Sequence, residues 1–417
     1  VVVDAPTTTI YAADFNVKGQ LMETNEDIHR HGGVLDYELD RNVINDYNSL
    51  GQIRVRQEET FHDGTNVTTT NTQTNTYDEE GRIIDSIDLN VTHGFLPTNM
   101  EDPLPEGIEN LLQGGQQEGL PEGEYQREQL THRYDIDYDP ESGRERGYTE
   151  KVTSNENPDL TRITTRSNID TDEVGQQGSW TDLIEETGKD MFNQFTTERL
   201  ETTFELGRVD TFTEHTYQGT QQDPNGLLRI TERLGTTYSL EHGLEVGYEQ
   251  RLTEEGKVPP LNHIRTVTRE EMDYNKDGQE TTYTETTWDN NTPDIWETLN
   301  RSDVSYNNGF LSRYTETTHR ESRNAANPVE TTSIIEHDGF IFDQLGRIVQ
   351  DTTWEKDIYG ATFDHVHQQQ FDGNGRIQET LDHQTRHKTD VVTRNHRFGI
   401  TYTDQGDQKS YTETQHS

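Results

Sequence analysis

The stretch that decides the fold is "YDEEGRIIDS", residues 77–86. An aromatic residue, an acid, two variable residues, a glycine and a basic residue follow one another. The same order returns as "FDQLGRIVQD" at 342–351 and "FDGNGRIQET" at 371–380. Asp at the first corner of a type I turn accepts hydrogen bonds from backbone N–H groups, and Gly adopts the left-handed conformation that closes a short hairpin. The motif therefore predicts a hairpin turn, with the aromatic residue and the following Ile packing across the two strands.

The three clear copies of the motif supply twelve predicted turn residues. Each arginine among them is expected to pair with the aspartate of a neighbouring turn. The residues are Tyr77, Asp78, Gly81, Arg82, Phe342, Asp343, Gly346, Arg347, Phe371, Asp372, Gly375 and Arg376.

Further copies extend the pattern along the chain. "FNVKGQL" begins at Phe15, "YNSLGQI" at Tyr47 and "YNKDGQE" at Tyr274, so that the motif recurs about every 30 residues. A period of this length indicates one serial array, and we treat residues 1–417 as a single domain. The segments between the turns are rich in Thr, Val and Ile, which favour strands. The predicted fold is all-β, with serial antiparallel β-hairpin repeats forming an extended sheet or solenoid-like array.

Two segments interrupt this pattern. Residues 94–124 are rich in Gly, Pro and acidic residues, and we expect an irregular insertion there. Residues 179–204 have apolar side chains at helical spacing, which predicts one short helical insertion. Its apolar face is expected to dock on the sheet or on a neighbouring subunit. The residues of that face are Trp180, Leu183, Ile184, Met191, Phe192 and Phe195.

These units resemble the tyrosine–aspartate (YD, or Rhs-like) repeat family, whose core reads Y-D-x-x-G-R. The resemblance covers most of the chain in scattered matches, and this chain is a divergent form with a longer repeat of about 30 residues. It implies a surface or secreted β-hairpin array of the kind that serves in shells, adhesion and wall association. The expected localisation is therefore extracellular or at the cell surface.

The composition limits the partners of the chain. The 417 residues carry a formal net charge of -44, only 27% are hydrophobic, and there is no cysteine. A surface this negative repels nucleic acid and anionic membranes and attracts cations. No apolar run approaches the ~18 residues of a membrane-spanning helix. We therefore expect neither a nucleic-acid partner nor a membrane span.

One segment has the spacing of a calcium-binding loop. In "DYNKDGQE", residues 273–280, Asp273, Asn275 and Asp277 alternate before Gly278, as oxygen ligands do around a hard cation. The twelfth position holds Thr284, where a calcium loop of the EF-hand type needs a bidentate Glu. The same residues also fit another hairpin turn, so the cofactor is either calcium or none.

Three classes of function remain open from the sequence. The first is a non-enzymatic structural protein that self-assembles through sheet edges into a filament, sheath or shell, since an unpaired edge templates further strands. The second is an adhesin or carbohydrate-binding repeat protein, which would use the aromatic residues Trp288, Trp296 and Trp354. The third is an enzyme on a β scaffold, but the chain has no G-x-S-x-G, H-E-x-x-H or phosphate-binding loop. We expect the first class, with the protein itself as the main partner.

Overall fold

The computed structural model describes residues 7–32, 35–96, 123–218, 227–240, 243–257, 260–323, 328–343, 345–387, 391–403 and 407–416. Within these ranges the chain forms 27 strands and no helix. The predicted all-β class is confirmed.

The strands follow one another along the chain, and apart from the segment between β6 and β7 their connections are short. The first nine are β1 Thr7–Phe15, β2 Leu21–Gly32, β3 Leu35–Tyr47, β4 Ile53–His62, β5 Val67–Tyr77, β6 Ile83–Phe95, β7 Glu124–Tyr138, β8 Glu145–Ser154 and β9 Thr161–Thr171. The next nine are β10 Gln177–Gly188, β11 Met191–Leu200, β12 Phe204–Glu205, β13 Arg208–Val209, β14 Phe212–Gln218, β15 Leu228–Tyr238, β16 Glu245–Lys257, β17 Pro260–Tyr274 and β18 Glu280–Asp289. The last nine are β19 Ile295–Asn307, β20 Phe310–Ser322, β21 Glu330–Asp338, β22 Ile341–Phe342, β23 Ile348–Lys356, β24 Thr362–Phe371, β25 Ile377–Arg386, β26 Val391–Tyr402 and β27 Gln408–His416.

A single sheet of 25 strands contains all of these except β12 and β13, which pair with each other. Nearly every strand pairs antiparallel with the strands before and after it in the chain. The exceptions are β11, which pairs with β14 around the small β12–β13 hairpin, and β21, which pairs with β23 around β22. The sheet is therefore a serial hairpin array, as the repeat predicts.

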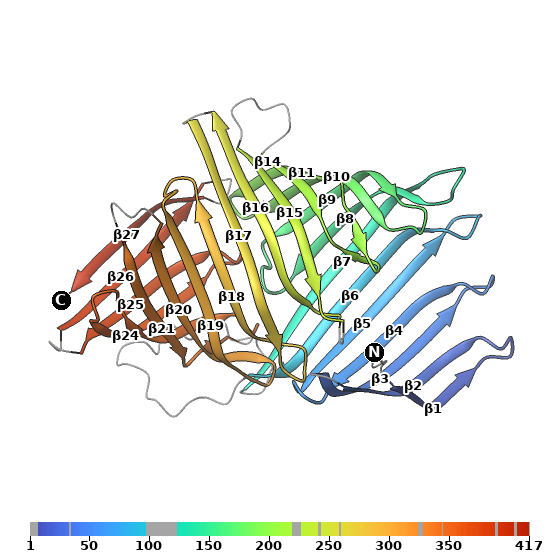
Figure 1. Cartoon of the computed structure of the whole chain (residues 1–417). Coiled ribbons are helices and arrows are strands. Elements are labelled where there is room, and N and C mark those ends of the chain that lie inside the picture. Colours follow the sequence, from blue (N-terminus) through green and yellow to red (C-terminus); the bar gives the residue numbers. More distant parts are fainter. Residues whose placement is uncertain are drawn as a thin grey trace.

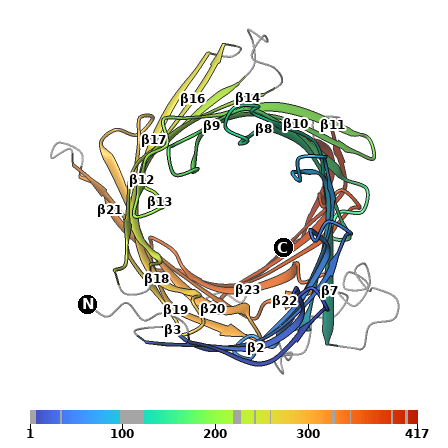
Figure 2. The same ribbon diagram turned by 90° about the vertical axis from the view of Figure 1, so that its right-hand side faces the viewer.

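The sheet coils around one axis instead of lying flat. Figure 1 shows the first strands at one end of the molecule and the last strands at the other, and Figure 2 shows the ribbons running around the axis. The accessible surface is 23917 Å², whereas a compact monomer of 48.1 kDa exposes about 16,500 Å². A single layer of sheet wound into a spiral leaves this extra surface exposed. Because so much surface faces water, the chain needs few hydrophobic residues.

Successive windings of the spiral touch along a seam. On one side of the seam lie the loops that follow β4, β6, β8 and β10 together with the start of β7, and on the other lie the motif turns of β17–β18, β19–β20, β22–β23 and β24–β25. The residues joined are 185 to 242 positions apart in the chain. The seam hydrogen bonds are Asn66 Nδ2 to Asn308 Oδ1 (3.2 Å), Arg127 Nη2 to Gly346 O (2.7 Å), Arg347 Nη1 to Glu156 O (2.9 Å), Asp159 N to Gly373 O (2.8 Å) and Asn374 Nδ2 to Lys189 O (2.9 Å).

The seam also contains an aromatic cluster. Tyr125 from the earlier winding is 5% exposed and meets Phe310 edge to face at 4.9 Å between centroids. Phe310 in turn contacts Phe342 at 4.6 Å. Aromatic pairs of this geometry add to the free energy gained by burial. The phenylalanine of the 342–347 motif is therefore part of the small core that joins two windings.

The predicted helix at 179–204 is wrong. Trp180, Leu183 and Ile184 lie in β10, and Met191 and Phe195 lie in β11. The same apolar residues that suit a helical face also suit two strands, because β9 offers β10 a full row of backbone partners from Thr161 to Thr171. Pairing in the sheet outweighs local spacing here.

The predicted irregular insertion at 94–124 is shorter than expected at both ends. Gly94 and Phe95 end β6, and Glu124 begins β7. The Leu96 N–H donates to Gly123 O at 2.8 Å and continues the hairpin. Residues 97–122 lie outside the described part of the chain.

Candidate functional site

The repeated motif forms the same turn at each clear copy. At Tyr77 the Asp78 N–H donates to Arg82 O at 3.0 Å, and the Gly81 N–H donates to Asp78 O at 3.2 Å. Asp78 Oδ1 accepts the Arg82 N–H at 2.8 Å, and Gly81 has a φ of 87°. The corresponding bonds recur at Asp343–Arg347 and Asp372–Arg376, where Gly346 and Gly375 have φ of 72° and 75°.

The tyrosine of the motif makes a hydrogen bond that was not predicted from the sequence. Its hydroxyl donates to a main-chain carbonyl next to an earlier turn, and in seven turns the acceptor stands two residues after that turn's glycine. These bonds are 2.5 to 2.7 Å long. They join Tyr47 to Leu21, Tyr77 to Ile53, Tyr138 to Ile83, Tyr238 to Val209, Tyr274 to Glu245, Tyr306 to Glu280 and Tyr402 to Ile377. In each of these seven cases a hydrogen bond joins a motif turn to the strand that follows an earlier turn.

Phe371 lacks the hydroxyl, and another side chain replaces it. The acceptor position after the preceding motif turn is Ile348 O, which accepts the amide of Gln369 at 2.9 Å. The array therefore satisfies the same carbonyl by a different donor.

Each motif arginine is expected from the sequence to pair with the aspartate of a neighbouring turn, and this expectation is wrong. Arg82, Arg347 and Arg376 each bind the Asp of their own turn through Nε at 2.8 Å. Since the four-residue spacing already brings the two charges together, the guanidinium plane remains free to lie over the aromatic ring of the next motif turn. The three rings are Tyr138 at 5.0 Å, Phe371 at 4.7 Å and Tyr402 at 4.6 Å.

A second arrangement, which we call the arginine–aromatic ladder, crosses the sheet from β7 to β20. Its six arginines are Arg133, Arg166, Arg199, Arg233, Arg269 and Arg301, and its six rings are Tyr148, Trp180, Phe212, Tyr248, Tyr283 and Tyr314. Each guanidinium lies 3.5 to 5.9 Å from one or two ring centroids. Residues directly opposite in the register, such as Trp180 and Arg199, share one face of the sheet, so the ladder occupies that face throughout.

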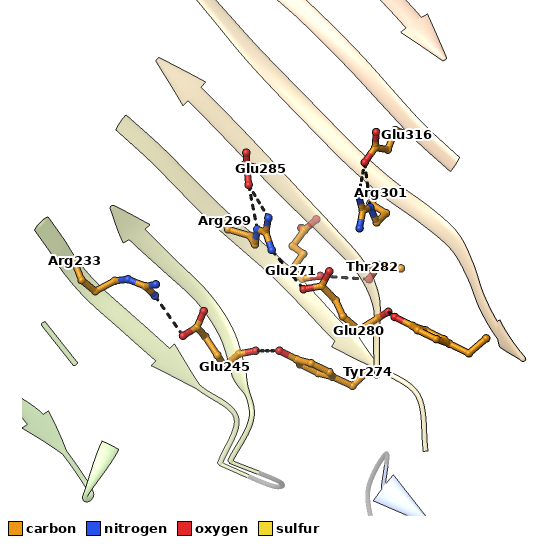
Figure 3. Close-up of polar contacts among 11 residues, drawn as sticks. Arg233, Glu245, Arg269, Glu271, Tyr274, Glu280, Thr282, Glu285, Arg301 and Glu316 are labelled. Carbon is orange, nitrogen blue, oxygen red and sulfur yellow. Dashed lines mark hydrogen bonds and ion pairs between the residues drawn. The ribbon is translucent and has the colours of Figure 1, made fainter. Parts of the chain in front are cut away.

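Every ladder arginine also pairs with a carboxylate of the adjoining strand. Figure 3 shows three of these pairs, Arg233–Glu245 at 3.3 Å, Arg269–Glu285 at 2.8 Å and Arg301–Glu316 at 2.6 Å. The others are Arg133–Glu145, Arg166–Asp182 and Arg199–Glu214. Half-buried guanidinium groups that stack on rings and bind carboxylates are satisfied within the sheet. The ladder therefore stabilises the fold and presents no free cation to a ligand.

Burial in the ladder changes the ionisation of its tyrosines. Burial, together with the nearby Glu316 carboxylate, raises the pKa of Tyr314 to about 12. Burial also raises the pKa of Tyr283, which is 6% exposed. These phenols stay protonated over the whole neutral range.

The sequence did carry a signal for this ladder. Its arginines recur every 32 to 36 residues and its rings every 31 to 36, which is the period of the turn motif. A search for one repeated residue type between the turns would have found them.

The residues of the predicted calcium loop form a motif turn. The Asn275 N–H donates to Gln279 O at 2.8 Å, and Asn275 Oδ1 accepts the N–H groups of Asp277 and Gln279. Asp273 Oδ1 accepts the Tyr274 N–H at 2.9 Å. These bonds engage two of the three predicted ligands, so the loop as it stands fits a turn better than a calcium cage.

Asp277 is the exception among the three. Its Oδ1 is buried against Gly64 of the other winding and has no hydrogen-bond partner in the described part of the chain, while Lys276 Nζ lies 3.8 Å away. Calcium binding stays a prediction that now depends on this one carboxylate. Over the described ranges, no group of three or more His, Asp or Glu side chains is arranged to hold a metal ion.

A hollow of about 420 Å³ lies at β7, β8 and β9. Asp135 and Asn168 have φ of 52° and 55°, and each stands at a β-bulge on a strand beside β8. Between them Gly147 has no room for a side chain, because a Cβ there would lie 2.7 Å from Arg166 O. The polar lining of the hollow consists of Asp135, Asp137, Arg146, Thr149, Thr165, Ser167 and Asn168.

The tryptophans named from the sequence lie in two places. Trp288 and Trp296 are directly opposite each other on β18 and β19, and Arg323 lies over Trp296 at 3.9 Å. Trp288 Nε1 donates to Pro293 O at 3.1 Å. Trp354 is on β23, opposite Asp364. All three are half-buried.

Comparison of the chain with models of known protein families and with the sequences of curated proteins gives no match. None of the described residues form a helix that is long and apolar enough to cross a membrane.

Proposed function

We propose that this protein is a non-enzymatic structural protein of the cell exterior, which self-associates through the edges of its coiled sheet into a filament, sheath or shell. The observation that carries the proposal is that β1 pairs only with β2 and β27 only with β26, so each edge strand has one unpaired side among the described residues. Unpaired N–H and C=O groups template a further strand.

The side chains of the two edge strands support this. Ile10 on β1 is 58% exposed and Tyr411 on β27 is 44% exposed, and β27 is exposed at all residues but one, whereas most residues of the inner strands are half-buried. Another strand laid along either edge would cover these side chains and complete the hydrogen bonding.

The direction of growth follows from the topology. The two edges are different strands at opposite ends of the coil (Figure 1). A contact between β1 of one copy and β27 of another is heterologous, and it propagates unless the rotation closes a ring. The resemblance to YD repeats favours an exterior location and leaves the geometry of the assembly to experiment.

The test is the mass of the purified protein in solution, measured by light scattering after gel filtration, together with electron microscopy. Ile10→Lys places a charge on the β1 edge and is expected to reduce association, because edge lysines oppose strand pairing. Val17→Lys is the matched control, since Val17 is fully exposed in the adjoining turn. A monomer at all concentrations, or equal loss in both variants, would overturn the proposal.

A second function is favoured by the hollow at Gly147. Carboxylates, an amide and hydroxyl groups converge there, which suits the hydrogen-bonding pattern of a sugar. In this reading the protein is an adhesin or carbohydrate-binding protein. Binding to a glycan array that Asp135→Ala and Asn168→Ala both abolish would support it, while Asp303→Ala, at a similar left-handed position on β19, serves as control.

A further inference from the structure

On β21 a histidine, His337, stands where the earlier hairpins of the arginine–aromatic ladder have an arginine. The ring of Tyr314 stacks on Arg301 at 4.3 Å on one side and on His337 at 4.1 Å on the other, with an interplanar angle of 17° to the imidazole. His337 thus occupies the next rung, where the preceding hairpins have arginine. A guanidinium is charged at any physiological pH, whereas an imidazole gains its charge only near pH 6.5 and below.

From His337 onward, imidazole and carboxylate groups alternate across four strands. His337 Nδ1 on β21 lies 2.9 Å from Asp351 Oδ2 on β23. Asp351 is directly opposite His367 on β24, and His367 Nδ1 lies 2.5 Å from Asp382 Oδ1 on β25. We call these four residues the histidine row.

More histidine–carboxylate contacts surround the row. His365 Nε2 lies 2.9 Å from Glu355 Oε2 on the same face. On the opposite face His387 Nε2 contacts Asp364 Oδ1 at 3.0 Å, and His396 contacts Glu379. Each of these contacts joins two neighbouring strands, as the arginine pairs do from β7 to β20.

The charges around the row are mainly negative. Asp351 Oδ1 is buried and has no hydrogen-bond partner in the described chain, so an added positive charge beside it is favourable. The charged groups that share the face of the row on the strands from β20 to β26 are Glu316 and Arg320 on β20, Asp351 and Glu355 on β23, His365 on β24, Asp382 and Arg386 on β25 and Arg397 on β26. Arg320 pairs with Glu297, the Arg386 guanidinium lies over the Phe363 ring at 5.8 Å, and the Arg397 guanidinium lies over the Tyr411 ring of β27 at 4.3 Å.

We propose that β21–β25 form a proton-sensitive part of the sheet, cross-linked by ion pairs in mildly acidic solution and loosened above neutral pH. Strands β7–β20 carry arginine in the same role and keep these arginine cross-links across this range, while His263 on β17 also contacts the carboxylates of Glu254 and Asp289. The protein therefore holds a built-in difference between two parts of one continuous sheet.

The stability of this part of the sheet is expected to be higher at low pH than at high pH. The hydrogen bond to Asp382 raises the pKa of His367 above its ordinary value, although burial opposes this. A raised pKa means that the folded state binds the proton more tightly than the unfolded state does. The added stability is thus complete below about pH 6.5 and is lost as the pH rises through the folded value. His383, whose pKa is lowered by burial and by Arg394, acts in the opposite direction from a place outside the row.

Hydrogen exchange with mass spectrometry between pH 5.5 and 8.5 tests the proposal on the unmodified protein. After correction for the intrinsic pH dependence of exchange, protection of peptides from 330–386 is expected to fall several-fold as the pH rises. Peptides from β8–β15, which exclude the histidine–carboxylate contacts of His132 and His263, are expected to change much less. An equal change in both parts of the sheet, or no change in either, would overturn the proposal.

Substitution identifies the groups responsible. The double variant His337→Arg and His367→Arg extends the arginine ladder by two rungs and is expected to remove the pH dependence of 330–386. The control is His319→Arg, because the His319 ring contacts the Thr332 hydroxyl at 3.1 Å on the opposite face. If the double variant does not fold, His367→Gln replaces it and should halve the effect or more. Full pH dependence in a folded row variant would show that other groups are responsible.

Discussion

The hydroxyl of Tyr274 donates to the carbonyl of Glu245, 29 residues earlier in the chain, at 2.6 Å. Glu245 itself pairs with Arg233 of the ladder, as Figure 3 shows. The main-chain carbonyl of Glu245 thus accepts the hydrogen bond from the motif tyrosine, and its side-chain carboxylate binds the ladder arginine. The two repeated patterns of the sequence meet at this point and share one period.

Removing this hydroxyl should weaken the array. Tyr274→Phe leaves Glu245 O without its donor, and the expected cost is about 1 kcal/mol of unfolding free energy. Urea denaturation followed by circular dichroism measures it. Tyr359→Phe, in a turn where the side chain is 88% exposed, is the matched control and should be neutral. Equal effects in both variants would mean that the bond contributes nothing.

The motif glycine is expected to tolerate no branched residue. Gly81→Val must place a β-branched side chain at a φ of 87°, with a cost of about 1 kcal/mol or more. A Cβ there would also meet Gln52 Nε2 at 2.9 Å. Gly178→Val, in β10 with open space around it, should cost little or stabilise the strand. A melting temperature unchanged in Gly81→Val would contradict the requirement for a left-handed turn.

Breaking one rung of the ladder should cost more than removing the whole rung. Arg269→Met removes the cation nearest to the half-buried Glu285 and leaves it only Arg265 at 3.8 Å, and we expect a loss of about 2–3 kcal/mol. The double variant with Glu285→Met should recover part of that loss, because the carboxylate closest to the missing cation is removed with it, although Glu280 at 3.5 Å still loses its partner. Arg269→Lys should fall between them, since a lysine cannot bind the carboxylate with two donors. Additive effects in this cycle would show that the pair is not coupled.

Alkaline solution should unfold the protein in a defined interval. The pKa of Tyr314 is raised by burial to about 12, and burial also raises the pKa of Tyr274 and Tyr402. A phenol whose folded pKa exceeds its unfolded value of about 10 stabilises the fold below pH 10 and loses that contribution as the pH rises toward 12. Phenolate absorbance at 295 nm and circular dichroism should therefore change together between pH 10 and 12. Full ionisation near pH 10 with the sheet intact would contradict the burial of these rings.

Calcium is expected to act through Asp277. The melting temperature should be higher in calcium than in sodium at matched ionic strength, because a cation would give the orphaned Asp277 Oδ1 a partner. Asp277→Asn should remove the difference, and Asp159→Asn, in another seam loop, should keep it. Coincident curves for the unmodified protein would leave 273–280 as a turn and nothing more.

The turns were predictable because they are local. Asp78, Gly81 and Arg82 lie within five positions and form their bonds with one another, so their sequence order is enough to specify them. The partner of the Tyr77 hydroxyl was not predictable in this way, since Ile53 O is a main-chain atom that no residue type marks.

The segment at 179–204 shows why spacing alone misled. Leu183 and Ile184 are adjacent and apolar, which a helix accommodates on one face, yet in β10 they lie on opposite faces. Ile184 is buried at 5% exposure beside the ladder. Pairing with β9 decides between a helix and a strand for this segment. Because β9 lies outside residues 179–204, the spacing of residues within that segment does not reveal the pairing.

The seam has a mechanical consequence. Hairpins of the sheet are joined by long rows of backbone hydrogen bonds, whereas the windings are joined by a few scattered hydrogen bonds and the Tyr125–Phe310–Phe342 cluster. A pull along the axis therefore loads the weakest contacts first. Under tension the molecule is expected to lengthen like an opening spring, with its windings apart and its strands still paired, and to recoil when the force is released.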